Sequence, residues 1–127
     1  MSKHNRCLAL TVVSWLLGFG VSSAGLLTPA HEVTLEGWLG QGDQAFTLIY
    51  QKSAGDSSAS FHAAADHKGA TFTLVEAIVG GKTYLIGGYN PASWTSSGNY
   101  TITSNDAERT AFLFNLTAMR LQRQRLN

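Results

Sequence analysis

Four side chains that could do chemistry fall within one short stretch of the chain: Ser60, His62, Asp66 and His67. If residues 58–65 form a helix, His62 and Asp66 lie near one face at spacing i, i+4, where their side chains can pair. A carboxylate beside an imidazole can orient it for acid–base work. The pair could also help to bind a metal, with a third ligand from elsewhere.

The same residues have a structural interpretation, which the sequence favours. Asp66 then caps a turn and His62 supports the loop through hydrogen bonds. No second carboxylate cluster lies nearby and no nucleophile elbow surrounds Ser60, so we expect no catalytic residue, no metal and no cofactor. Gly81-Lys82-Thr83 resembles the end of a phosphate-binding loop, but Glu76 stands where that motif needs Gly and would repel a phosphate.

Short elements joined by tight turns must position these residues. Thr28-Pro29 predicts a helix start and Gly40 a helix end. A strand through Val33, Leu35 and Gly37 is the alternative. A second, short helix is expected over residues 58–65. The expected strands, two of them joined by a Gly80-Gly81 hairpin turn, cover residues 45–51, 71–78, 82–87 and 110–116.

The N-terminal 24 residues have the three parts of a signal peptide. A basic start, with Lys3 and Arg6, precedes an apolar run from Cys7 to Phe19 that is too short to span a bilayer as a helix. Ser22 and Ala24 then supply the small residues that signal peptidase requires. We therefore expect export to the periplasm or the extracellular space, with cleavage after Ala24. Cleavage removes the single cysteine and with it disulfide and thiolate chemistry.

Length and charge limit the remaining function classes. The 127 residues suffice for one domain. Removing residues 1–24 takes two of the nine Lys and Arg, which leaves seven against eight Asp and Glu and a net charge near −1. This balance argues against a nucleic-acid partner. We also expect no membrane span after signal cleavage.

The order of motifs from Phe46 to Leu116 resembles the TLDc domain family. FTLIY is followed by the loop KSAGDSSAS, then by FHAAADHKGATFTLVEA, YLIGGYNPASWTSSGNY and AFLFNL. No single motif is specific, but their order and spacing are. The residues that carry the resemblance, which are our motif and structural candidates, are Phe61, His62, Asp66, Lys68, Gly69, Gly87, Gly88, Tyr89, Trp94, Phe112 and Phe114.

The resemblance implies a mainly β, α+β fold: a two-sheet antiparallel β-sandwich with short flanking helices. We expect a partial TLDc-like domain over residues 25–116, incomplete at its C-terminus, and a basic polar tail without a strand over 117–127. Many family members have a cysteine where this chain has Ala65. We expect Gly87-Gly88 to allow a turn or a close approach, and Trp94 to hold its loop on the sheet.

The sequence leaves three functional hypotheses. The first is an exported, non-catalytic binding module whose ligand is unknown. Its partner would be an unknown protein, or a second copy paired through open sheet edges. The second is a hydrolase or metal-dependent enzyme that uses His62 and Asp66, and the third is a non-functional gene fragment. Eukaryotic TLDc members act in oxidative-stress protection and bind the proton-pumping ATPase, but those partners are intracellular and are not transferred.

Overall fold

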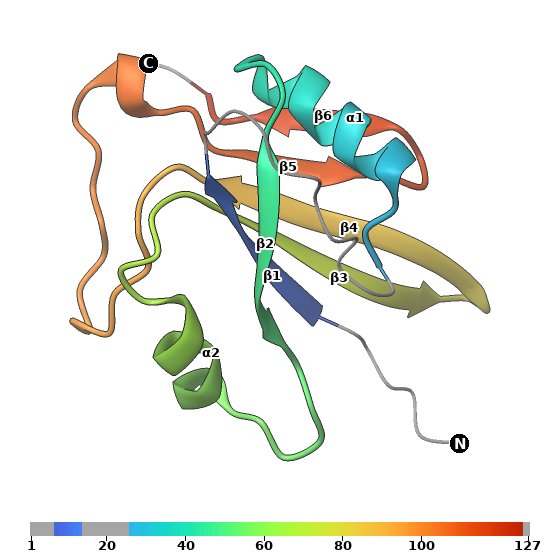
Figure 1. Ribbon diagram of the computed structural model, residues 1–127, viewed down its shortest axis with the longest axis horizontal. Helices are drawn as coiled ribbons and strands as arrows, with labels where there is room; N and C mark the ends of the chain where they lie inside the picture. The colour runs from blue at the N-terminus through green and yellow to red at the C-terminus, as the bar shows by residue number, and fades with distance from the viewer. Residues whose placement is uncertain (1–6, 14–25, 126–127) are drawn as a thin grey trace.

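The computed structural model describes residues 7–13 and 26–125, with side chains from residue 26 onward (Figure 1). The helices are α1 (Pro29–Leu39), α2 (Ser58–Ala65) and the short 3-10 turn η1 (Asp106–Glu108). The strands are β1 (Cys7–Val13), β2 (Ala45–Gln51), β3 (Thr71–Val79), β4 (Lys82–Asn90), β5 (Phe112–Asn115) and β6 (Arg120–Arg123). No helix in these ranges is long and apolar enough to cross a membrane.

The described strands form one antiparallel sheet in the order β2-β1-β3-β4-β5-β6. The mainly β, α+β fold class is therefore confirmed, as are its short flanking helices. The expected division into two sheets is wrong for this part of the chain. Strand β1 pairs with β2 on one side and with β3 on the other, which joins β2 to the β3–β6 meander in a single sheet.

Strand β1 comes from the segment expected to be the apolar part of a signal peptide. Its backbone runs from Cys7 to Val13, and Cys7 to Thr11 lie opposite Val75 to Thr71 of β3. An uncharged aliphatic run suits an inner strand as well as a signal-peptide core. Signal cleavage stays a prediction, because residues 1–6 and 14–25, Ala24 included, lie outside the described chain.

Helix α1 begins and ends as expected. The Thr28 hydroxyl accepts a hydrogen bond from the His31 backbone N–H, and Gly40 ends the helix in the left-handed region at φ 71°. The alternative strand through Val33 and Gly37 is wrong. Leu35 projects from α1 onto the sheet and is fully buried, so this helix covers one face.

The face under α1 holds the hydrophobic core. Register places Phe72, Tyr89 and Phe112 in one row across β3, β4 and β5, and Leu74, Gly87 and Phe114 in the next. Residues directly opposite each other point to the same face. All the side chains in these rows are buried. The turn Gly80-Gly81 joins β3 to β4 with both φ angles positive, which confirms the expected hairpin.

Strand β6 corrects the expectation of a tail without a strand. Its four residues pair with β5, and Leu121 packs against the core. The Arg123 guanidinium donates a hydrogen bond to the Trp38 carbonyl at 2.6 Å and lies over the Phe112 ring at 5.3 Å. The Trp38 carbonyl lies in the last turn of α1, where carbonyls have no partner within the helix. The charged side chain of Arg123 therefore stabilises both β6 and the C-terminal end of α1.

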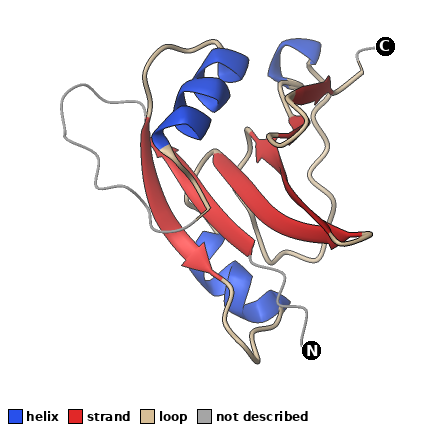
Figure 2. Ribbon diagram, turned by 90° about the vertical axis from the view of Figure 1, so that its right-hand side faces the viewer, coloured by secondary structure: helices blue, strands red, loops and turns tan. Residues whose placement is uncertain are grey.

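Helix α2 lies on the opposite face of the sheet from α1 (Figure 2). It contacts β2 through Phe61, whose ring meets Tyr50 edge-on at 5.4 Å. A register shift at β1 leaves Ile49 without a partner between Leu48 and Tyr50. Because the extra residue reverses the alternation of side chains, Leu48 packs in the core and Tyr50 faces α2.

Candidate functional site

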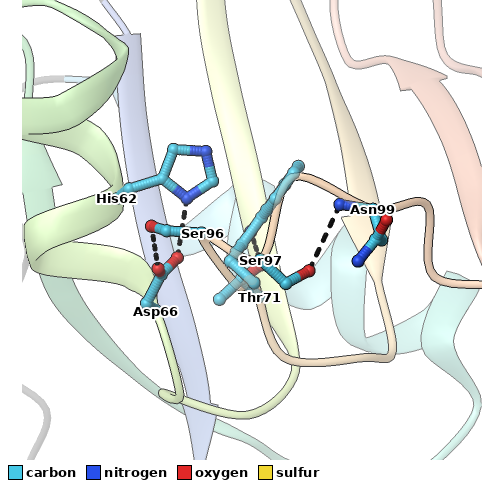
Figure 3. Close-up of polar contacts among 7 residues, drawn as sticks. His62, Asp66, Thr71, Ser96, Ser97 and Asn99 are labelled. Atoms are coloured by element: carbon cyan, nitrogen blue, oxygen red, sulfur yellow. Dashed lines mark hydrogen bonds and ion pairs between the residues drawn. The ribbon is translucent and has the colours of Figure 1, made fainter.

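His62 and Asp66 do pair, as their helical spacing predicts. The imidazole Nδ1 lies 2.7 Å from the Asp66 Oδ1, within α2 and its C-cap. The second carboxylate oxygen, Oδ2, accepts a hydrogen bond from the Ser96 hydroxyl, which lies in the loop after β4 (Figure 3). The carboxylate thus stands between a hydroxyl and an imidazole, and it links α2 to a loop thirty residues further along the chain.

Trp94 fixes the same loop to the sheet, as expected. Its indole N–H donates to the Thr71 hydroxyl at 2.9 Å, and Thr71 is fully buried in β3. The Trp94 ring meets Phe61 edge-on at 5.2 Å, and its carbonyl accepts from the His67 backbone N–H. An aromatic anchor with a satisfied N–H holds a loop more firmly than apolar contact alone. The loop after β4 is therefore held at both Ser96 and Trp94.

The surroundings of Asp66 favour its ionised form. The Ser96 hydroxyl and the His62 imidazole both donate hydrogen bonds to the carboxylate. These bonds lower the pKa of Asp66 below its ordinary value, and the Ser96 bond has the larger effect. Partial burial opposes this effect without reversing it. Asp66 is therefore a charged acceptor at neutral pH.

The order of these groups differs from that of a hydrolytic triad. In a triad the histidine stands between the nucleophile and the acid, and takes the proton from the serine. Here Asp66 stands in the middle, and Ser96 donates to it rather than to His62. Ser60 does not join the cluster, because its hydroxyl accepts from the Ser57 backbone N–H at the α2 N-terminus. The His67 imidazole makes no hydrogen bond within the described residues.

The described chain offers no ready metal centre. Residues 7–13 and 26–125 contain no group of three or more His, Cys, Asp and Glu side chains placed to hold a metal ion. The two closest candidates, His62 and Asp66, already bind each other through Nδ1 and Oδ1. The third ligand that the metal hypothesis requires is not supplied by this part of the chain.

A groove of about 380 Å³ lies beside the cluster. It runs between α2, the loop after β4 and the loop before β5. Amide, hydroxyl and aromatic side chains dominate its walls, and no Lys or Arg contributes. The lining residues are His62, Asn90, Pro91, Ala92, Ser93, Trp94, Thr95, Asn99, Tyr100, Thr101, Thr103, Glu108, Ala111 and Gln124.

The remaining motif candidates divide between core and turn. Tyr89 packs on Phe72 with ring centroids 4.9 Å apart, and burial raises the pKa of its hydroxyl. Phe112 and Phe114 are buried while Leu113 between them is 63% exposed, as their spacing predicts.

A methyl group on Gly87 would collide with the Thr73 carbonyl and approach the Phe114 ring to 2.6 Å. Gly87 therefore permits the expected close approach. A methyl group on Gly88 would meet nothing closer than 3.2 Å.

The turn after α2 contains Lys68 and Gly69. Gly69 takes a φ of 82° there, and its backbone N–H donates to the Ser93 hydroxyl. The Lys68 side chain is exposed.

Sequence reasoning missed three residues of this site: Ser96, Thr71 and Tyr100. Ser96 and Thr71 reach their partners across long stretches of chain, which no local spacing reveals. Tyr100 is 96% exposed and lines the groove. The signal that could have revealed Tyr100 is an aromatic residue within a Ser- and Gly-rich loop.

No protein-family model, curated protein or solved structure matches this chain. Membership of the TLDc family therefore stays a prediction that rests on the motifs in the sequence.

Proposed function

We propose that this protein is an exported, non-catalytic binding module of TLDc-like sequence, whose ligand lies in the groove beside Trp94. The observation that carries the proposal is the use of Asp66. Both of its carboxylate oxygens accept hydrogen bonds from the protein itself, one from His62 and one from Ser96. A carboxylate used in this way positions a loop at the groove, and leaves no oxygen assigned to a nucleophile or a metal.

The composition of the groove supports a neutral polar ligand. Side chains such as Asn90, Ser93 and Thr95 offer amide and hydroxyl groups, which bond equally well to donors and acceptors. Trp94 and Tyr100 add aromatic surface. Phosphate and other anions are recognised chiefly by Arg and Lys, neither of which lines the groove. A neutral, hydroxyl-rich molecule such as an oligosaccharide fits these walls best.

A matched pair of exposed residues tests the groove. Tyr100 lines it, whereas Ile102 in the same loop does not, and both are more than four-fifths exposed. We expect a panel of neutral oligosaccharides to include a ligand whose affinity, measured by calorimetry, falls about tenfold in Tyr100→Ala. Ile102→Ala should bind as the wild type does. Equal loss in both variants, or preference for sulfated saccharides, would contradict the proposal.

The enzymatic alternative retains one supporting observation. His62 lines the groove, and Asp66 orients its imidazole from behind, which is the arrangement of a general base. On this hypothesis His62→Ala abolishes a hydrolytic activity while the circular dichroism and melting temperature stay unchanged. A variant that loses stability without losing any turnover supports the binding module instead.

A further inference from the structure

Strand β1 lies in a slot whose walls are strands β2 and β3. Since β1 is antiparallel to both, β2 and β3 run parallel to each other, and α2 connects them. Their separation is two strand spacings, about 9.6 Å. This is a split β-α-β unit, in which an inserted strand completes the hydrogen bonding of both neighbours. Within the described chain β2 pairs with no other strand.

Side-chain contacts that bypass β1 hold the two walls at this separation. On the α1 face, the rings of Phe46 in β2 and Phe72 in β3 meet with centroids 5.8 Å apart. On the α2 face, Phe61 touches both Tyr50 of β2 and Trp94, and Trp94 donates to Thr71 of β3.

These contacts span the slot above and below the position of β1. The slot is therefore a built feature of the fold.

Signal cleavage after Ala24 would free the occupant of this slot from the chain. Without β1, the inward-facing backbone of β2 and one edge of β3 would lose their hydrogen-bond partners. Buried backbone groups without hydrogen-bond partners are strongly unfavourable, so an empty slot is unstable. Strand addition at an open edge is an established mode of peptide recognition.

We propose that, after export, this slot accepts an extended segment of a second polypeptide, antiparallel to β3, in the place of β1. The proposal rests on the predicted signal cleavage. It concerns the backbone edges of β2 and β3, no residue of which lines the groove. The walls define the segment that fits. Neither β2 nor residues 71–75 of β3 carry a charged side chain, and the present occupant, CLALTVV, has none. The occupant is a strand of about seven uncharged, mainly aliphatic residues.

Register provides a direct test through position 75. The β1 residue opposite Val75 is Cys7, the only cysteine in the chain. A full-length chain with Cys7→Ser and Val75→Cys would carry an inserted protease site after Ala24, and would be cut after folding. A fluorescent peptide of residues 7–13 that retains Cys7, with lysines outside the strand for solubility, is then offered in excess. Directly opposed residues of antiparallel strands lie within disulfide range.

We expect this peptide to form a disulfide with position 75 at least tenfold faster than with a chain that carries Ile102→Cys instead. Ile102 is 85% exposed and lies outside the sheet. A cysteine at this position therefore gives the rate of disulfide formation with the peptide when no slot positions it. A peptide with Leu10→Pro and a peptide of reversed sequence should both lose the preference. Equal rates at the two positions would overturn the proposal, as would cross-linking of two cut chains in place of the peptide.

The natural N-terminus of the exported protein supplies an independent check. A mass that begins at Gly25 supports a slot emptied by processing. A mass that includes residues 7–13 makes β1 a permanent strand and overturns the proposal, while leaving oligosaccharide binding at Tyr100 untouched.

Discussion

The two halves of the sheet are built on different principles. Strands β3 to β6 follow one another along the chain, and β4, β5 and β6 each pair with the strand before them. Among the described strands β2 pairs with β1 alone, and residues 14–44 separate these two strands in the chain. Local pairing costs little loop-closure entropy, whereas the β1–β2 half depends on one distant segment. We infer that the meander is the stable half and that β2 with α2 is the conditional one.

The largest expected effect comes from breaking β1 itself. Leu10 pairs with Leu48 of β2 and Phe72 of β3, and proline cannot contribute its N–H to an inner strand. In the full-length chain, Leu10→Pro should destabilise the β2 and α2 region by on the order of 3 kcal/mol. Hydrogen exchange measures this loss: amides of β2 and α2 should exchange rapidly while those of β3–β5 stay protected.

Uniform loss of protection over both halves would show that they unfold as one unit. The division into a stable meander and a conditional β2 and α2 region would then be wrong. Thr34→Pro is unsuitable as a control because it breaks α1, but Ser104→Pro changes a loop outside the sheet. That loop variant should leave the exchange pattern of both halves unchanged.

Gly87 tests the meander in the same way. A methyl group there meets the Thr73 backbone carbonyl and the Phe114 ring, and neither can move without shifting the core. We expect Gly87→Ala to lower the free energy of unfolding by about 2–3 kcal/mol. Gly88→Ala, the neighbouring control, should cost less than about 1 kcal/mol. Its methyl group meets the flexible end of Leu113 at 3.2 Å and the Phe112 carbonyl at an ordinary contact distance of 3.6 Å. Denaturant unfolding followed by tryptophan fluorescence compares the two, and equal costs would contradict the packing argument.

Arg123 tests the outer edge of the meander. Its guanidinium bonds to the Trp38 carbonyl and covers the Phe112 ring, so Arg123→Ala should cost about 1 kcal/mol. Arg120 lies in the same strand and its side chain makes no hydrogen bond or ion pair within the described residues. Arg120→Ala should therefore change stability by less than about 0.5 kcal/mol. Thermal melts of both variants decide whether β6 is a structural strand or a dispensable tail.

The sequence predicts the features that depend on local contacts and misses those that depend on distant ones. Helix caps, the Gly80-Gly81 turn and the alternation around Leu113 are local signals, and the structure bears them out. The inner position of β1 could not be predicted, because an uncharged aliphatic run has the same composition in a signal peptide and in a buried strand. Strand β6 was missed because its Arg123 acts through the distant Trp38 carbonyl.

The candidate site was half predictable for the same reason. The His62–Asp66 pair follows from helical spacing, and the structure forms it at 2.7 Å. Ser96, which completes the cluster, joins through the tertiary fold. Without Ser96 the pair resembles an unfinished catalytic site, and with it the pair links α2 to the loop after β4. Long-range partners thus decide between a chemical and a structural role.

The smallest expected effect concerns this link between α2 and the loop. Asp66 has a folded pKa below the unfolded value of about 3.9, so its contribution to stability is present above that pH and is lost as pH falls through the folded pKa. Asp66→Asn should therefore show a shallower loss of stability than the wild type below about pH 4. Ser96→Ala, which removes the larger cause and leaves the His62 bond, should fall between them. Part of the acid response persists in both variants, since the Ser53 backbone N–H likewise lowers the pKa of Asp56. Melting temperatures at several pH values measure the slopes, and identical slopes in all three proteins would remove Asp66 from the account of how the loop is held.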